Sequence, residues 1–179
     1  MKNNNNFEII RSKRKTLALE IDSQANLIIR APRLMPLFLI KKFIQKKQNW
    51  ITKKQKLIQT RNLEIKSLPS KRQISKNQAE QILKPRVQHY AAILKLKYQK
   101  IKITSAQKRW GSCSVQNNLN FPLRLALAPN EIINYVVVHE LCHIKYKNHS
   151  QNFWNEVAQI MPDYKKHRKW LKNKGYLLK

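Results

Sequence analysis

The feature that most constrains the fold of this chain is an apolar run between positions 130 and 146. Its apolar residues occupy nearly every face of an α-helix, a pattern typical of a helix enclosed by other structure. They are Ile132, Ile133, Val136, Val137, Val138, Leu141, Cys142 and Ile144. Asn130 has a typical N-cap side chain, so we expect the helix to begin there and to end near Tyr146. The rest of the chain must therefore supply layers that cover this central helix.

Three polar residues lie inside the apolar run, in the sequence HELCH. His139 and His143 are four positions apart, so they project from one helical face and can reach a single ion. Glu140 points to the side, where its carboxylate can act as a general base on a water molecule that the metal activates. This is the H-E-x-x-H pattern of zinc hydrolases. A bound ion also offsets the free energy of burying these polar groups.

A catalytic zinc site needs three protein ligands and one open position. If the chain reverses just after the central helix, His149 returns to the metal, and Asn148 tolerates the left-handed backbone that such a turn requires. The sequence therefore predicts one zinc ion per chain, held by His139, His143 and His149.

Two other residues compete with His149 for the remaining coordination positions. Glu156 lies on the next predicted helix, and Cys113 would close the site if it bound the metal. The histidine spacing also matches the metzincin arrangement. That class is disfavoured, because Tyr146 replaces the metzincin glycine and Met161 lies at a predicted helix end.

The predicted elements fall into two groups joined by a polar segment. Residues 1–60 form a small lobe, with a β-hairpin over 17–29 and a helix over 37–57. Residues 61–76 are predicted to be a linker. The domain over residues 77–179 begins with a helix over 77–97, which Pro85 should kink or divide.

Short strands follow at IKIT, at KRWGSCS and over 119–125, where Pro122 favours an edge position. Gly111 in KRWGSCS allows a bulge or a close backbone approach. Two helices follow, one capped by Ser150 and one that Gly175 ends. This order predicts an α+β fold, in which a mixed sheet packs on the buried HExxH helix and the C-terminal helices.

The charge balance bears on the partners of the protein. Its 37 Lys and Arg residues against nine Asp and Glu residues give a net charge of +28. Such a field attracts polyanions, so nucleic acid or ribosomes are candidate partners through the basic runs at 11–15 and 165–169. Compositional drift of an AT-rich coding sequence would produce the same excess. The sequence carries no nucleic-acid-binding motif that decides between them.

Cysteine usage and hydropathy bear on location. Cys113 and Cys142 form no disulfide framework. No apolar run is long enough to span a bilayer or to form the core of a signal peptide. A cytoplasmic location is expected.

Residues 135–172, YVVVHELCHIKYKNHSQNFWNEVAQIMPDYKKHRKWLK, resemble the YgjP-like family of predicted metal-dependent hydrolases, zincin metallopeptidases related to the SprT-like group. KRWGSCS, the following LNFPLRLALAP and the N-terminal RSKRKTLALEID extend the resemblance over most of the chain. It implies that His139, His143 and His149 are the metal ligands and that Glu140 is the catalytic carboxylate. The chain departs from the family pattern at Gln116 and Asn117, where a glycine is common.

The sequence thus predicts a zinc-dependent metallopeptidase that cleaves peptide or protein substrates. The alternative is a nucleic-acid- or ribosome-associated basic protein with a structural metal site, and an amidase for small molecules is a third reading. Arg109, Tyr135 and His167 are candidates to stabilise the oxyanion. We expect KRWGSCS to be an edge strand over the metal, and Trp110, Phe153, Trp154 and Trp170 to be core residues.

Overall fold

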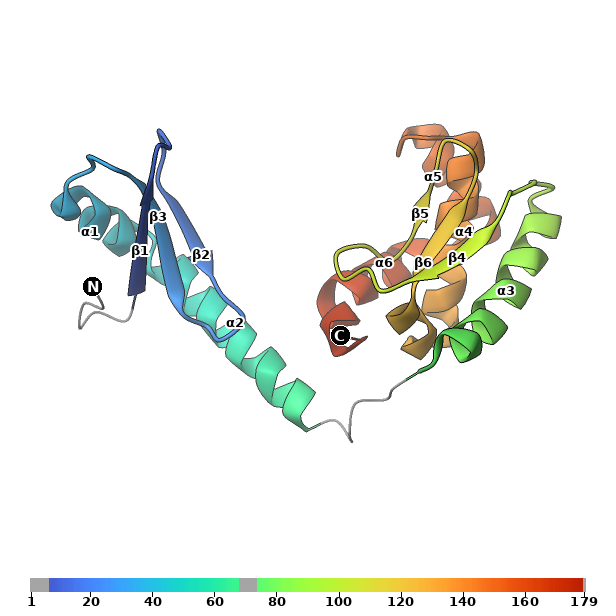
Figure 1. The fold of residues 1–179 in the computed structure, drawn as a ribbon, viewed down its shortest axis with the longest axis horizontal. Helices are drawn as coiled ribbons and strands as arrows, with labels where there is room; N and C mark the ends of the chain where they lie inside the picture. The colour runs from blue at the N-terminus through green and yellow to red at the C-terminus, as the bar shows by residue number, and fades with distance from the viewer. Residues whose placement is uncertain (1–6, 68–73, 179) are drawn as a thin grey trace. The chain divides into compact units, whose positions relative to one another are not determined.

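The computed structural model describes residues 7–67 and 74–178, and the chain divides into two compact units, residues 1–68 and 69–179 (Figure 1). In the first unit, β2 (Ala18–Ile21) and β3 (Leu27–Pro32) pair antiparallel, which confirms the predicted hairpin. A further strand, β1 (Phe7–Ser12), pairs parallel with β3. The β1 sequence, FEIIRS, does not alternate regularly between apolar and polar residues, so no local pattern predicted this strand. It is defined by its pairing with β3.

Two helices, α1 (Leu37–Lys46) and α2 (Gln48–Lys66), replace the single helix expected over 37–57. The expected linker needs correction as well, since its residues 61–66 lie in α2; its residues 68–73 lie outside the described part of the chain. Tertiary hydrogen bonds hold α2 on the β2–β3 turn. Gln55 donates to the carbonyl of Ala25 (2.9 Å) and Asn62 to that of Ser23 (2.8 Å), contacts that no local pattern reveals.

The second unit is organised around α4 (Asn130–Lys145), whose burial on nearly every face is confirmed. It packs against α3 (Lys76–Ile93), α5 (Gln151–Ile160), α6 (Tyr164–Lys174) and a small sheet (Figure 1). Asn130 is not the N-cap, which is Pro129; the Asn130 side chain instead accepts a hydrogen bond from Arg86 (2.7 Å). Pro85 lies inside α3 without dividing it, and α3 ends at Ile93, earlier than expected.

The sheet of this unit has the order β4-β6-β5, formed by Ile101–Thr104, Leu119–Pro122 and Ser112–Cys113. β4 and β6 are parallel and β5 is antiparallel, so the predicted mixed sheet and α+β class are confirmed. β5 is an edge strand, as predicted from KRWGSCS. The edge position predicted for β6 is wrong, since β6 is central; it tolerates Pro122 because β5 pairs only with Leu119 and Asn120.

The strand expected over 119–125 ends at Pro122, and the following residues form the 3₁₀ helix η1 (Leu123–Leu127). Gly175 also departs from expectation: its φ of −57° is not left-handed, and it begins the 3₁₀ helix η2 (Gly175–Leu178). A Cβ atom on Gly175 would lie 2.7 Å from the Trp110 ring, so close packing explains this glycine. Ser150 is the N-cap of α5, as predicted. None of the helices in the described residues is long and apolar enough to cross a membrane.

Candidate metal centre

The structure brings His139, His143 and His149 together. α4 supplies the first two, and the chain reverses after α4 so that His149, just before α5, faces them. Each histidine offers a ring nitrogen, and these three atoms all lie within 4.8 Å of one another. The Nε2 atoms of His139 and His149 are 3.1 Å apart, close to the roughly 3.3 Å that separates two nitrogens bound to one tetrahedral zinc ion. The donor set therefore fits a divalent metal ion.

Neighbouring residues orient these rings. The Nδ1 atom of His143 lies 2.9 Å from the Tyr146 carbonyl oxygen, which leaves its Nε2 atom for a metal. Phe153, in the first turn of α5, is fully buried, and its ring centroid lies 4.9, 4.6 and 4.8 Å from those of His139, His143 and His149. Trp154 stacks on His149 at 5.4 Å. Phe153 is a core residue, as predicted, but sequence reasoning missed that α5 also supports the histidines.

A lysine of the α4–α5 connection fastens it to the edge of the sheet. Lys147 donates hydrogen bonds to the Asn117 side chain (2.8 Å) and to the Ser114 carbonyl (3.3 Å), both in the β5–β6 turn. The turn that carries His149 is therefore held by a contact between segments about 30 residues apart in the chain.

The electrostatics of the centre favour neutral imidazoles. Burial, together with the neighbouring His143 and His149, lowers the pKa of His139 to about 3. Burial also lowers the pKa of His149. A metal ion binds the deprotonated form of histidine, so the lowered pKa values of His139 and His149 favour metal binding near neutral pH.

Glu140 lies beside the histidines in an apolar setting. Its side chain is only 5% exposed, and its Oε2 atom is buried without a hydrogen-bond partner. Burial raises its pKa to about 8, although the charge of Arg109 opposes the shift. Gly111 makes room for this carboxyl group, because a Cβ atom there would lie 2.5 Å from its Oε1 and Cγ atoms. The close backbone approach predicted at Gly111 is confirmed.

The two competing ligands lie elsewhere. Glu156 forms an ion pair with Lys145 at 3.0 Å, and the Cys113 thiol lies 3.5 Å from the Ser114 carbonyl oxygen. Among the described residues, the group close enough to share a metal consists of the three histidines. The described part of the chain adds no fourth protein ligand to this group.

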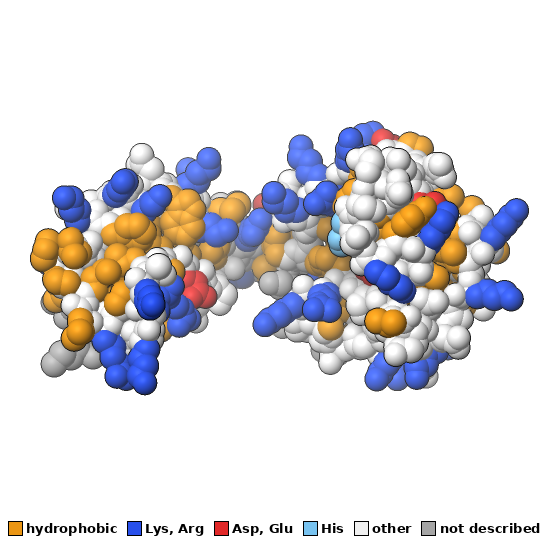
Figure 2. Space-filling model, turned by 90° about the horizontal axis from the view of Figure 1, so that it is seen from above, with side chains coloured by type: hydrophobic (Ala, Val, Ile, Leu, Met, Phe, Trp, Pro, Cys, Tyr) orange, Lys and Arg blue, Asp and Glu red, His pale blue; other side chains and the backbone are white. Residues whose placement is uncertain are grey.

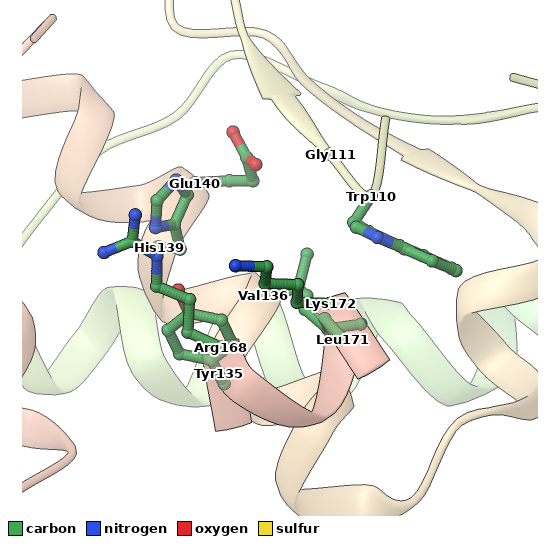
Figure 3. Close-up of a pocket in the computed structure, with 9 residues that line it drawn as sticks. All are labelled: Trp110, Gly111, Tyr135, Val136, His139, Glu140, Arg168, Leu171 and Lys172. Carbon is green, nitrogen blue, oxygen red and sulfur yellow. The ribbon is translucent and has the colours of Figure 1, made fainter. Parts of the chain in front are cut away.

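A cavity of about 370 Å³ opens beside the centre (Figure 3). Its wall is formed by Trp110, Gly111, Tyr135, Val136, His139, Glu140, Arg168, Leu171 and Lys172. Of the three oxyanion candidates, Tyr135 lines it, whereas Arg109 and His167 do not. Burial raises the pKa of Tyr135 to about 12, so its hydroxyl group stays protonated and can donate a hydrogen bond.

Arg124 contacts the segment that contributes Trp110 and Gly111 to the cavity wall, and the sequence alone did not predict this role. It is only 8% exposed, and its guanidinium group donates to the carbonyls of Gln107 (2.8 Å) and Arg109 (3.3 Å). The same group lies 3.7 Å from the centroid of the Trp110 ring. Arg124 thus holds the segment that places Trp110 and Gly111 at the cavity. The alternating apolar residues around Arg124 predicted a strand and gave no indication of a buried arginine.

We expect Gly111→Ala to disturb the centre, because the added methyl group overlaps the buried Glu140 side chain. Overpacking of this kind destabilises a protein by about 1–3 kcal/mol, and a displacement of about 1 Å can lower turnover by about 100-fold. Urea unfolding and kcat measure the two effects. Ser112→Ala is the control, since it removes only a partly buried 3.2 Å hydrogen bond to Asn120. Unchanged stability and turnover in Gly111→Ala would contradict the packing described.

The raised pKa of Glu140 predicts how stability depends on pH in chelator-treated protein. Between the ordinary pKa of 4.5 and about 8, the folded state holds a proton that the unfolded chain releases, so stability falls as pH rises. His139 and His149, with pKa values lowered from 6.5, have the opposite effect up to about pH 7.5, because the unfolded chain still binds protons there. From pH 6.5 to 8 we therefore expect the free energy of urea unfolding to fall by about 1 kcal/mol. The fall should disappear in Glu140→Gln; a fall retained in that variant would assign it to another group.

Comparisons with known proteins bear on the identity of the chain. The model of the YgjP-like metallopeptidase domain matches residues 15–73 and 66–174. Similar solved structures include the metallopeptidase zymogens abylysin of Pyrococcus abyssi and jannalysin of Methanocaldococcus jannaschii, each 22% identical to this chain. They cover 50% and 51% of this chain and 93% and 95% of their own, with TM-scores of 0.46 and 0.47. No curated protein matches. Since the family model spans most of its length, this chain belongs to the YgjP-like metallopeptidases, which hydrolyse peptide bonds with the help of a metal ion.

Proposed function

We propose that the protein is a zinc-dependent peptidase in which His139, His143 and His149 hold the metal and Glu140 is the general base. The observation that carries this proposal is the convergence of three histidine nitrogens beside a buried, unpartnered carboxyl group on the wall of a cavity. When bound there, a zinc ion polarises the scissile carbonyl and makes a water molecule more acidic.

The protein side chains supply the proton transfers. Glu140 takes the proton of the attacking water and returns it to the leaving amine. Its pKa of about 8 lies near neutrality, where a group exchanges a proton in both directions with the smallest penalty. Tyr135 lines the cavity and its hydroxyl group stays protonated, which supports it as the donor of a hydrogen bond to the developing oxyanion. An extended peptide could add to the free edge of β5 by strand pairing.

The basic composition does not favour the binding-protein alternative. In Figure 2, Lys and Arg side chains are spread over the visible face of each unit and do not gather into one stripe that a nucleic acid would follow. We therefore propose a peptide or protein as the substrate. The free cysteines Cys113 and Cys142 suit a reducing compartment, which supports the proposed cytoplasmic location.

Metal removal tests the proposed function. Purified protein is incubated with casein and with a set of internally quenched peptides, before and after treatment with a chelator. We expect cleavage to stop on chelation and to return with one equivalent of zinc per chain. Cleavage that survives complete metal removal would contradict the mechanism. Zinc bound at one per chain without cleavage of any substrate would favour a structural metal site.

A further inference from the structure

The cavity beside the metal centre lies where part of a bound substrate must rest. His139 and Glu140 form one side of it, so an occupant of the cavity lies next to the bond that is hydrolysed (Figure 3). Trp110 and Gly111 form the opposite side, and α6 contributes the remaining residues. The side chains that α6 directs into this space therefore contact whatever group of the substrate occupies it.

α6 contributes two positive charges to the cavity. Arg168 and Lys172 are four residues apart, so they project from the same helical face, and both line the cavity. Like charges at this spacing repel each other. Neither forms an ion pair with any acidic residue in the described part of the chain; Lys166, by contrast, pairs with Asp163 at 2.9 Å. The Arg168 guanidinium group lies 4.9 Å from the centroid of Trp154, which itself stacks on His149.

Apolar residues form the rest of the cavity near these charges. Val136, Leu171 and Trp110 line it together with Lys172 (Figure 3). A short aliphatic chain that ends in a negative group would satisfy both the apolar walls and the two cations.

We propose that this cavity is a specificity pocket that binds a carboxylate of the substrate through Arg168 and Lys172. The inference rests on the proposed peptidase function. The carboxylate is either the side chain of an Asp or Glu residue next to the cleaved bond or the free C-terminus of a peptide. The two sources share one chemistry, and the guanidinium fork of Arg168 suits the two oxygens of either.

Cleavage-site mapping tests the inference and separates the two sources of the carboxylate. The zinc-loaded enzyme digests a complex peptide mixture, once with free C-termini and once with amidated C-termini, and mass spectrometry identifies the bonds cut. For an acidic side chain, we expect Asp and Glu to be enriched at one position beside the cut in both mixtures. For a C-terminal carboxylate, we expect the cuts to lie at a fixed distance from the C-terminus and to disappear after amidation.

Charge-reversal variants test whether Arg168 and Lys172 cause the preference for a carboxylate. In Arg168→Glu and Lys172→Glu, we expect the preference for the carboxylate to fall by about 10- to 100-fold. Lys169→Glu is the matched control, since Lys169 is exposed on α6 but does not line the cavity. Arg168→Gln removes the charge without reversing it. Zinc content and thermal unfolding, measured on every variant, separate the loss of charge from damage to the fold.

The outcomes distinguish failure of the pocket assignment from failure of the peptidase function. Wild-type cleavage with neither preference, or a preference that both charge-reversed variants retain, overturns the pocket assignment and leaves the peptidase function standing. A preference lost equally in Lys169→Glu overturns it too, because the net charge and not the pocket would then be responsible. No cleavage of any peptide by zinc-loaded wild-type protein overturns the proposed function and the pocket together.

Discussion

Replacing Glu140 with glutamine should abolish peptide cleavage while leaving the metal in place. The amide side chain has nearly the same size as the carboxyl group it replaces but cannot take a proton from the attacking water. General acid–base catalysis of this kind contributes about 100- to 10,000-fold, so we expect kcat/KM to fall by that factor. Elemental analysis should still find one zinc ion per chain, because the three histidine nitrogens converge without the carboxyl group.

The matched control for this variant is Glu131→Gln. Glu131 is an exposed acidic residue in the first turn of the same helix, so its replacement removes the same charge far from the histidines. Its activity should stay close to that of the wild type. If Glu140→Gln kept more than about a tenth of the wild-type rate, another group would be the proton acceptor, since that loss is below the usual range for a general base.

Replacing His149 with alanine should release the metal and with it the activity. A structural zinc site is worth roughly 10–16 kcal/mol in total, so each of four ligands contributes about 2.5–4 kcal/mol. We therefore expect the zinc dissociation constant to rise by about 100- to 1,000-fold. Competition with a chromophoric chelator measures this change directly, without any need for a substrate.

His89→Ala is the control for the loss of a histidine. His89 is exposed on α3 and lies outside the group that could hold a metal. It should bind zinc like the wild type. Undiminished zinc affinity in His149→Ala would mean that another residue completes the site, and the same measurement on Glu156→Ala and Cys113→Ala would identify it.

The grouping of the three histidines could be predicted from sequence because these residues lie close together in the chain. His139, Glu140 and His143 occupy consecutive turns of one helix, and helical periodicity alone puts both histidines on one face. The apolar residues around them predicted that the helix is central, and the structure confirms this. His149 follows closely enough for a single chain reversal to return it.

Some errors came from elements that tertiary contacts stabilise. β1 pairs in parallel with β3, and α2 extends to Lys66 while Asn62 bonds to the β2–β3 turn. Residues 123–127 leave the strand although leucines alternate there, and within them Arg124 bonds to carbonyls of residues 106–109. These partners are distant in sequence, so the local periodicity of apolar residues does not predict the contacts between them.

The sequence by itself determined the candidate metal centre: a buried helix that carries HELCH, and a nearby histidine to join it. Only the tertiary structure decided what surrounds that centre. Gly111 leaves space for the Glu140 carboxyl group, and Arg168 and Lys172, which read in the sequence as part of a basic helix, line the cavity beside it. The physical reason is that metal-ligand spacing follows from one helix, whereas the pocket forms between residues about 60 positions apart in the chain, which only folding brings together.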